Sequence, residues 1–193
     1  MKKINASTIL VLVFLLGLSV LLYPSVSNYW NSFHQSRAIV DYNAVYQSMS
    51  REDYSREFAE AVQYNAKLSA LDRPLSEFEQ VPGYEDILNV TGTGILGYIA
   101  IEKIGVELPI YHGTSEGVLN VAAGHLRGTS LPTGTPGTHP VFSAHRGLPS
   151  AKLFTDLDEL EPGDPFVVTV LDRVLTYRVD RVLIVEQIGR VHV

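Results

Sequence analysis

Glycine and proline divide the chain, because both are missing from residues 28–71 and both recur from residue 72 onwards. Proline breaks a helix interior and glycine weakens it, so a long stretch without either favours helix. We predict two helices, over residues 28–48 and 51–70. Ser50 can cap the second helix, and Glu52 and Asp53 would then lie at the positive end of its dipole. We expect these helices to form an amphipathic stalk that packs one face on the rest of the protein.

From Gly97 the pattern changes to short apolar segments that are separated by glycine, proline and acidic turns. The predicted strands are residues 98–101, 106–110, 141–145, 166–171 and 174–185, with a short helix within 115–121 and a turn at 161–164. Pro109 has no amide hydrogen, so its strand must be at a sheet edge or bulged there. Many short strands with few helices predict a mainly β fold, a barrel or a sandwich. Residues 72–94 read as a long loop, and loops of this length are usually functional or mobile.

The N-terminus carries two lysines followed by an apolar run from Ile4 to Tyr23. A helix of about 20 residues would just cross a bilayer core of about 30 Å, with the lysines left in the cytoplasm. No small-x-small cleavage site follows, so we predict an uncleaved membrane anchor in preference to a cleaved signal peptide or a buried core helix. The predicted organisation is an anchor at 1–27, a helical approach with a possible lid loop at 28–93, and a β domain at 94–193.

Composition excludes several classes of function. The formal net charge is -6 and no basic patch is visible, so we expect no nucleic-acid partner. The chain contains no cysteine, which excludes disulfides, thiolate zinc sites and a thiol nucleophile within these 193 residues. A histidine zinc site is an alternative, built from His112, His125, His139 and His145. No pair of them has the helical spacing of a zinc-binding motif and no acidic partner has ligand spacing, so we predict no metal and no cofactor.

Three ordered stretches carry a family resemblance: residues 95–113 (ILGYIAIEKIGVELPIYHG), 124–132 (GHLRGTSLP) and 143–154 (SAHRGLPSAKLF). Together they resemble the sortases, and the third is typical of class C, the pilin-polymerising branch. The resemblance covers about residues 64–186 and implies the sortase β-barrel. It also implies a cysteine transpeptidase on the outer face of a Gram-positive-type cell membrane. Its partners would be pilin subunits with LPxTG-like sorting signals, which such enzymes cleave and join to a lysine of the next pilin through an isopeptide bond.

The resemblance assigns roles to individual residues. His145 matches the catalytic histidine, which would activate the cysteine and protonate the leaving amine; alternatively it only ends a strand. His125 lies in the second stretch, and we expect it to shape the site or bind substrate. Class C sortases often carry an Asp-Pro-aromatic lid, and a lid built on Asp72 and Pro74 is the candidate here. The similar letters at residues 164–166 follow a turn and are expected to start a strand instead.

The resemblance ends at Glu186 in our reading. In the family, the next strand ends in a TLxTC motif with the nucleophilic cysteine, and the catalytic arginine follows on another strand. We expect both residues and the last barrel strands to be absent from these 193 residues, by a frameshift or a premature stop. The domain would then be an incomplete barrel with open edges, inactive in transpeptidation. The alternative is a non-catalytic remnant, or a membrane-tethered module that binds pilin signals.

Overall fold

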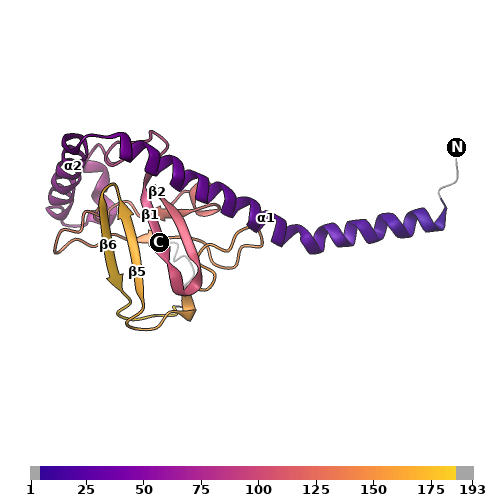
Figure 1. Ribbon diagram of the computed structural model, residues 1–193. Helices are drawn as coiled ribbons and strands as arrows, with labels where there is room; N and C mark the ends of the chain where they lie inside the picture. Colours follow the sequence, from indigo (N-terminus) through magenta and orange to yellow (C-terminus); the bar gives the residue numbers. More distant parts are fainter. Residues whose placement is uncertain (1–4, 186–193) are drawn as a thin grey trace.

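A computed structural model describes residues 5–185, and its longest element is helix α1, Ala6–Ser48. We predicted an anchor followed by a separate helix from residue 28, but α1 runs through both regions without a break. Pro24 lies inside it, where proline removes one backbone hydrogen bond and bends a helix without necessarily ending it. Figure 1 shows the first half of α1 projecting from the molecule and the second half crossing the sheet, with a bend between them.

Helix α2, Arg51–Ser69, begins where its sequence predicts. The Ser50 hydroxyl accepts a hydrogen bond from the Asp53 amide, and the Asp53 carboxylate accepts one from the Ser50 amide, each at 3.2 Å. This capping box satisfies two amide groups that a helix start leaves unpaired. The helix buries Phe58 and Tyr64 among others against the domain. Two short helical turns follow, α3 at Pro74–Glu77 and η1 at Phe78–Gln80.

Six strands form one curled sheet, a half-barrel, in the order β4-β3-β2-β1-β5-β6. All neighbours are antiparallel except β2 and β3, which are parallel. The strands are β1 Ile95–Ile101, β2 Val106–His112, β3 Ala123–His125, β4 Phe142–Ser143, β5 Pro165–Val170 and β6 Arg173–Arg178. Between them lie η2 Glu102–Ile104, α4 Glu116–Leu119 and η3 Leu157–Glu159. The predicted mainly β fold, preceded by helices, is therefore confirmed.

Two strand predictions were too long. Strand β4 has only two residues, and β6 ends at Arg178 and not at residue 185. Strand β5 begins at Pro165, after the 161–164 turn, and Pro165 pairs with Arg178 of β6. Beyond Arg178, the chain therefore has no ladder partner in β5 within the described residues. The prediction for Pro109 is confirmed, because β3 pairs with β2 only from Ile110 onwards. At Pro109 that side of the strand is open, as the missing amide hydrogen requires.

The core joins the helices to the sheet. Tyr42 of α1, the inner face of α2 and the strands contribute to one buried cluster. Residues 72–94, expected to be an extended loop, also enter it through Val81, Tyr84, Ile87 and Leu88. Their spacing would suit one face of a helix, but Pro82 and Gly83 lie among them, so the sequence indicated a loop and these residues were not recognised as core. The consequence is that only the beginning of this segment, around Asp72 and Pro74, remains a candidate lid.

Candidate active site and its surroundings

His145 follows edge strand β4 by two residues and is partly buried. Its carbonyl accepts a hydrogen bond of 3.1 Å from the Phe154 amide, which closes the 145–154 segment into a loop. Within residues 5–185, no hydrogen bond or ion pair engages its imidazole. An imidazole without a fixed protein partner can exchange a proton with a substrate, whereas one held at both nitrogens cannot.

An open, mostly apolar groove of about 540 Å³ lies beside this edge. Its walls come from β1, the residues before β4, the 154–160 segment, and the chain after β6. The lining residues include Ile99, His139, Phe142, Phe154, Phe166 and Val182. A second hollow adjoins it and is lined by residues 142–144, Arg146 and residues 182–185. Arg146, which lines this second hollow, is paired with Asp158 at 2.7 Å.

His125 is fully buried and lies behind the groove wall on β3. Its Nδ1 is 2.9 Å from the Tyr84 hydroxyl, and its Nε2 is 2.9 Å from the Ser130 carbonyl. The carbonyl can only accept, so Nε2 carries the proton; the single Tyr84 hydroxyl proton then faces two acceptors, Nδ1 and the His125 carbonyl oxygen at 3.0 Å. Burial lowers the pKa of His125 to about 4, so the ring is neutral at pH 7. The buried ring presents no exposed surface to a substrate in this structure, and a role for His125 in shaping the site stays a prediction.

Tyr84 and His112 extend this buried network; from the sequence, we considered His112 only as a zinc ligand and did not single out Tyr84. The Tyr84 hydroxyl also accepts a 3.0 Å hydrogen bond from the Gly113 amide. The two ring nitrogens of His112 each lie 3.0 Å from a carbonyl oxygen, of Gly94 and of Ile87. Burial lowers the pKa of His112, and the two carbonyls oppose that shift. A signal existed for His112, because it continues the inward-facing alternation of β2.

The candidate lid segment lies against the loop that follows β3. Gly128 has a φ of +83°, and a Cβ there would approach the Cα of Leu75 and the carbonyl of Pro74 to 2.8 Å each. Within the segment, Arg73 forms an ion pair of 3.0 Å with Glu77, four residues later. Pro74 and Leu75 therefore lie beside Gly128, and no hydrogen bond or ion pair within residues 5–185 joins Asp72 or Pro74 to His145.

The four histidines of the alternative zinc site are not brought together. Among residues 5–185, no three His, Cys, Asp or Glu side chains could share a metal ion. Both ring nitrogens of His112 and of His125 are within hydrogen-bond distance of other protein atoms. A metal ligand needs a free nitrogen lone pair, so these two positions do not suit one.

Comparison with known proteins agrees with this architecture. A profile of the sortase domain matches residues 99–192. Sortase C1 from Streptococcus agalactiae is 41% identical, with a TM-score of 0.67 over 75% of this chain and 76% of that one. A sortase C from Streptococcus pneumoniae is 36% identical, with a TM-score of 0.62 over 75% of this chain and 74% of that one. No curated protein matches. The chain therefore belongs to the sortase family of transpeptidases.

Within that family it is a class C sortase-like protein, since its structural relatives include several class C enzymes. A sortase C-1 from Actinomyces oris is among them, at 38% identity and a TM-score of 0.58 over 67% of this chain and 74% of that one. The profile continues to residue 192, so our reading that the family resemblance ends at Glu186 was wrong. The frameshift hypothesis depended on the C-terminal residues being unrelated to the family. It therefore loses its support.

Proposed function

We propose that this chain is the front part of a pilin-polymerising sortase, held to the membrane by α1, with His145 as its catalytic histidine. The observation that carries the proposal is an unengaged imidazole at the end of edge strand β4, beside an open apolar groove. An extended sorting signal with an apolar Leu-Pro portion suits such a groove, since its threonine carbonyl could then lie near His145. The Streptococcus pneumoniae relative, described with its pilin substrate specificity, supports pilin as the substrate class.

The chemistry that the family resemblance implies needs a thiolate. The thiolate attacks the threonine carbonyl, the threonine–glycine bond breaks, and the departing glycine amine takes a proton from the histidine. A pilin lysine amine then attacks the thioester, which forms the isopeptide bond and frees the thiol. His145 can serve as the proton donor and can lower the pKa of a nearby thiol. The 193 residues contain no cysteine, so we expect this polypeptide alone to form no thioester.

A chimaera tests the proposal while leaving residues 1–186 intact. The cysteine- and arginine-bearing strands of a class C sortase would follow Glu186, and transpeptidation of an LPxTG peptide onto a lysine-containing pilin domain would be measured. We expect activity in the chimaera and none in the 193-residue chain. His145→Ala should lower the rate by about 10²–10⁴-fold, the usual contribution of an acid–base group. His139→Ala is the matched control, because His139 lines the groove near the β4 edge and has no proposed proton-transfer role.

The outcomes separate the alternatives. If His145→Ala retains the chimaera's rate, the assignment of His145 is wrong. If the chimaera folds and neither binds nor processes the peptide, the proposed substrate class is wrong. If the 193-residue chain binds an LPxTG peptide and the chimaera is inactive, the non-catalytic binding module is the better description. Mass spectrometry of the 193-residue chain after incubation with peptide would reveal any acyl-enzyme, which our expectation forbids.

A further inference from the structure

One side of α1 is fixed to the domain by three side chains. Asn28 accepts a hydrogen bond of 2.7 Å from the Lys152 amide, and Asn31 donates one of 2.8 Å to the Ser150 carbonyl. Gln35, one turn later, donates one of 2.7 Å to the Val121 carbonyl. At 100° per residue, these three positions fall within an arc of about 60°. The domain therefore contacts a single, defined side of the helix from residue 28 onwards.

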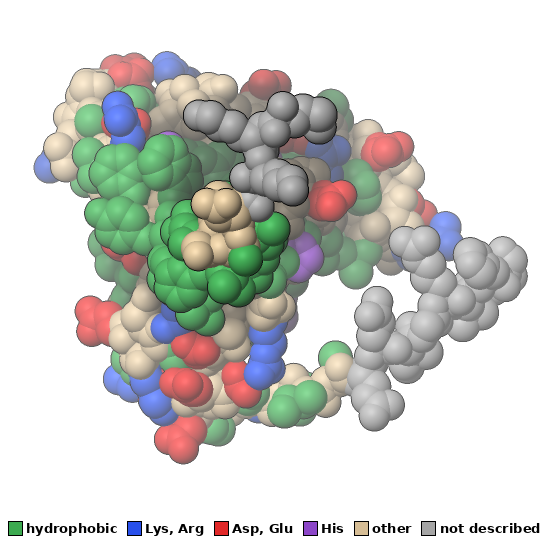
Figure 2. Space-filling model, turned by 90° about the vertical axis from the view of Figure 1, so that its right-hand side faces the viewer, with side chains coloured by type: hydrophobic (Ala, Val, Ile, Leu, Met, Phe, Trp, Pro, Cys, Tyr) green, Lys and Arg blue, Asp and Glu red, His purple; other side chains and the backbone are tan. Residues whose placement is uncertain are grey.

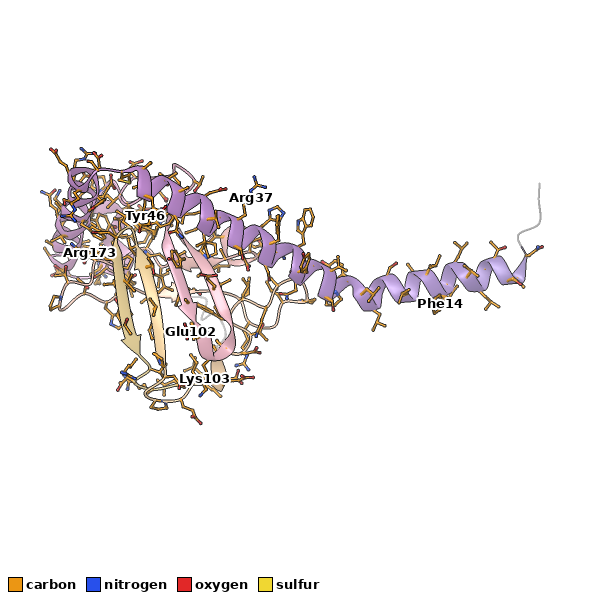
Figure 3. The ribbon with its side chains drawn as sticks, viewed as in Figure 1. Phe14, Arg37, Tyr46, Glu102, Lys103 and Arg173 are labelled. Carbon is orange, nitrogen blue, oxygen red and sulfur yellow. The ribbon has the colours of Figure 1, made fainter. Side chains whose placement is uncertain are left out.

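The opposite side carries a stripe of exposed apolar residues. Val26, Tyr29, Trp30 and Phe33 lie within an arc of about 100° that is centred about 180° from the domain-facing side. They are 63%, 75%, 63% and 53% exposed, respectively. We call these four residues the aromatic stripe. Arg37 follows one turn later on the same side and points away from the domain in Figure 3.

The stripe continues the apolar surface of the projecting helix. That part of α1 contains a window with mean hydropathy 2.5 that is not buried at all by the protein. Viewed along its axis in Figure 2, it is covered by hydrophobic side chains on all sides. Residues 4–36 contain no Asp, Glu, Lys or Arg, so the uncharged stretch extends well beyond the roughly 20 residues that a bilayer core needs. The excess residues are those of the aromatic stripe and their neighbours.

Lengths place the stripe at a particular depth. Residues 6–33 span about 42 Å as a helix, which matches the roughly 40–45 Å thickness of a bilayer with its headgroup layers. The stripe therefore falls in the interface, where Trp and Tyr are enriched because their rings are apolar and their polar atoms reach water. Arg37 comes next, at the level where a cation meets lipid phosphates. A protein partner covering the stripe would have to enter the headgroup layer.

We propose that the aromatic stripe lies in the headgroup layer of the outer leaflet and, with Asn28 and Asn31 on the opposite side, seats the domain directly on the membrane. The partner of this surface is thus a phospholipid interface. The inference rests on the proposed membrane anchor and adds that no flexible linker separates anchor from domain, since α1 is continuous across the junction.

Trp30 is the chain's single tryptophan, so its fluorescence reports the stripe directly. The full chain would be reconstituted in phosphatidylcholine–phosphatidylglycerol vesicles with bromine atoms placed either near the headgroup or near the acyl-chain end. We expect stronger quenching of Trp30 by the shallow bromines than by the deep ones. Two control variants carry Trp30→Phe: one adds Phe14→Trp in the projecting helix, and the other adds Val40→Trp on the same side beyond Arg37. The first should be quenched most by deep bromines and the second by neither.

Each other outcome is decisive. If Phe14→Trp is quenched and Trp30 is not, the anchor stands and the seating of the domain is refuted; crosslinking would then show whether a second copy covers the stripe. If Trp30 is quenched most by deep bromines, the stripe lies in the bilayer core and our placement is wrong. If the Phe14→Trp variant is not quenched at all, the membrane anchor itself fails, which is a different result from failure of the stripe.

Discussion

Replacing Tyr42 with phenylalanine removes a single hydroxyl group, and we expect it to destabilise the protein strongly. The Tyr42 hydroxyl donates a hydrogen bond of 3.1 Å to the Leu96 carbonyl and accepts one of 2.8 Å from the Leu171 amide. Both backbone groups are irregular: Leu96 lies where the β1–β2 register shifts, and Leu171 has a φ of +51° in the β5–β6 turn. Neither the Leu96 carbonyl nor the Leu171 amide belongs to a residue paired in the β1–β2 or β5–β6 ladder. The Tyr42 hydroxyl of α1 therefore supplies a hydrogen-bond partner to both.

The magnitude follows from burial. Tyr42, Leu96 and Leu171 are all essentially inaccessible to water, so Tyr42→Phe leaves a carbonyl and an amide unpaired with no route to solvent. Each buried unpaired group costs about 1–3 kcal/mol. We expect a loss of about 2–4 kcal/mol in the free energy of unfolding, partly offset if a water enters. With a denaturant slope of about 2 kcal/mol per molar urea, the midpoint should fall by about 1–2 M.

Urea unfolding of the full chain in phospholipid nanodiscs, followed by far-ultraviolet circular dichroism, measures this change. Tyr98→Phe is the matched control, because the Tyr98 ring packs edge-to-face on Tyr42 and its hydroxyl has no hydrogen bond within residues 5–185. The control should change the midpoint little. Equal midpoints for Tyr42→Phe and the unaltered chain would refute the reasoning, and equal losses in both variants would assign the effect to ring packing instead.

Three further predictions concern other parts of the fold. Gly128→Ala should displace the candidate lid and speed chymotryptic cleavage after the exposed Leu75, whereas Gly137→Ala, with a positive φ of +82° and no neighbour within 4 Å, should not. Because the pKa of His125 is about 4 in the folded chain and about 6.5 when unfolded, the unfolded state binds the extra proton. Stability should then fall by about 3 kcal/mol as the pH drops from about 6.5 to 4, and His125→Gln should flatten this dependence in urea titrations. Ser50→Ala should cost about 1 kcal/mol through loss of the helix cap, measured in the same assay.

Local rules predicted the elements whose causes are local. The cap at Ser50, the turn at residues 161–164 and the alternation of β2 each depend on neighbours within a few residues, and the structure has all three. The place of Pro109 at an open strand side was predicted for the same reason, because a missing amide hydrogen is a property of one residue. The break expected near residue 28 was wrong, since one proline can bend a helix without ending it.

Contacts between distant segments were beyond the sequence. Tyr84 meets His125 across 41 positions of the chain, and nothing around Tyr84 indicates a buried hydroxyl. Residues 81–88 look like an irregular loop because Pro82 and Gly83 interrupt the segment, yet their apolar side chains complete the core. His145 could be placed at a strand end by pattern, and its role came from the family resemblance. Its proximity to a groove depends on the chain after β6, which packs there without forming a strand.

The candidate active site and helix α1 are connected through one short loop. The loop begins at His145 and runs to Ser150 and Lys152, which are bonded to Asn31 and Asn28 of α1. Seven residues span at most about 25 Å, so His145 lies no further than this from the junction of helix and domain. If the aromatic stripe lies in the headgroup layer, His145 is close to the membrane surface and its height is fixed by a continuous helix. A sorting signal on a membrane-bound partner would then reach the groove by lateral diffusion, and no change in the domain's height would be needed.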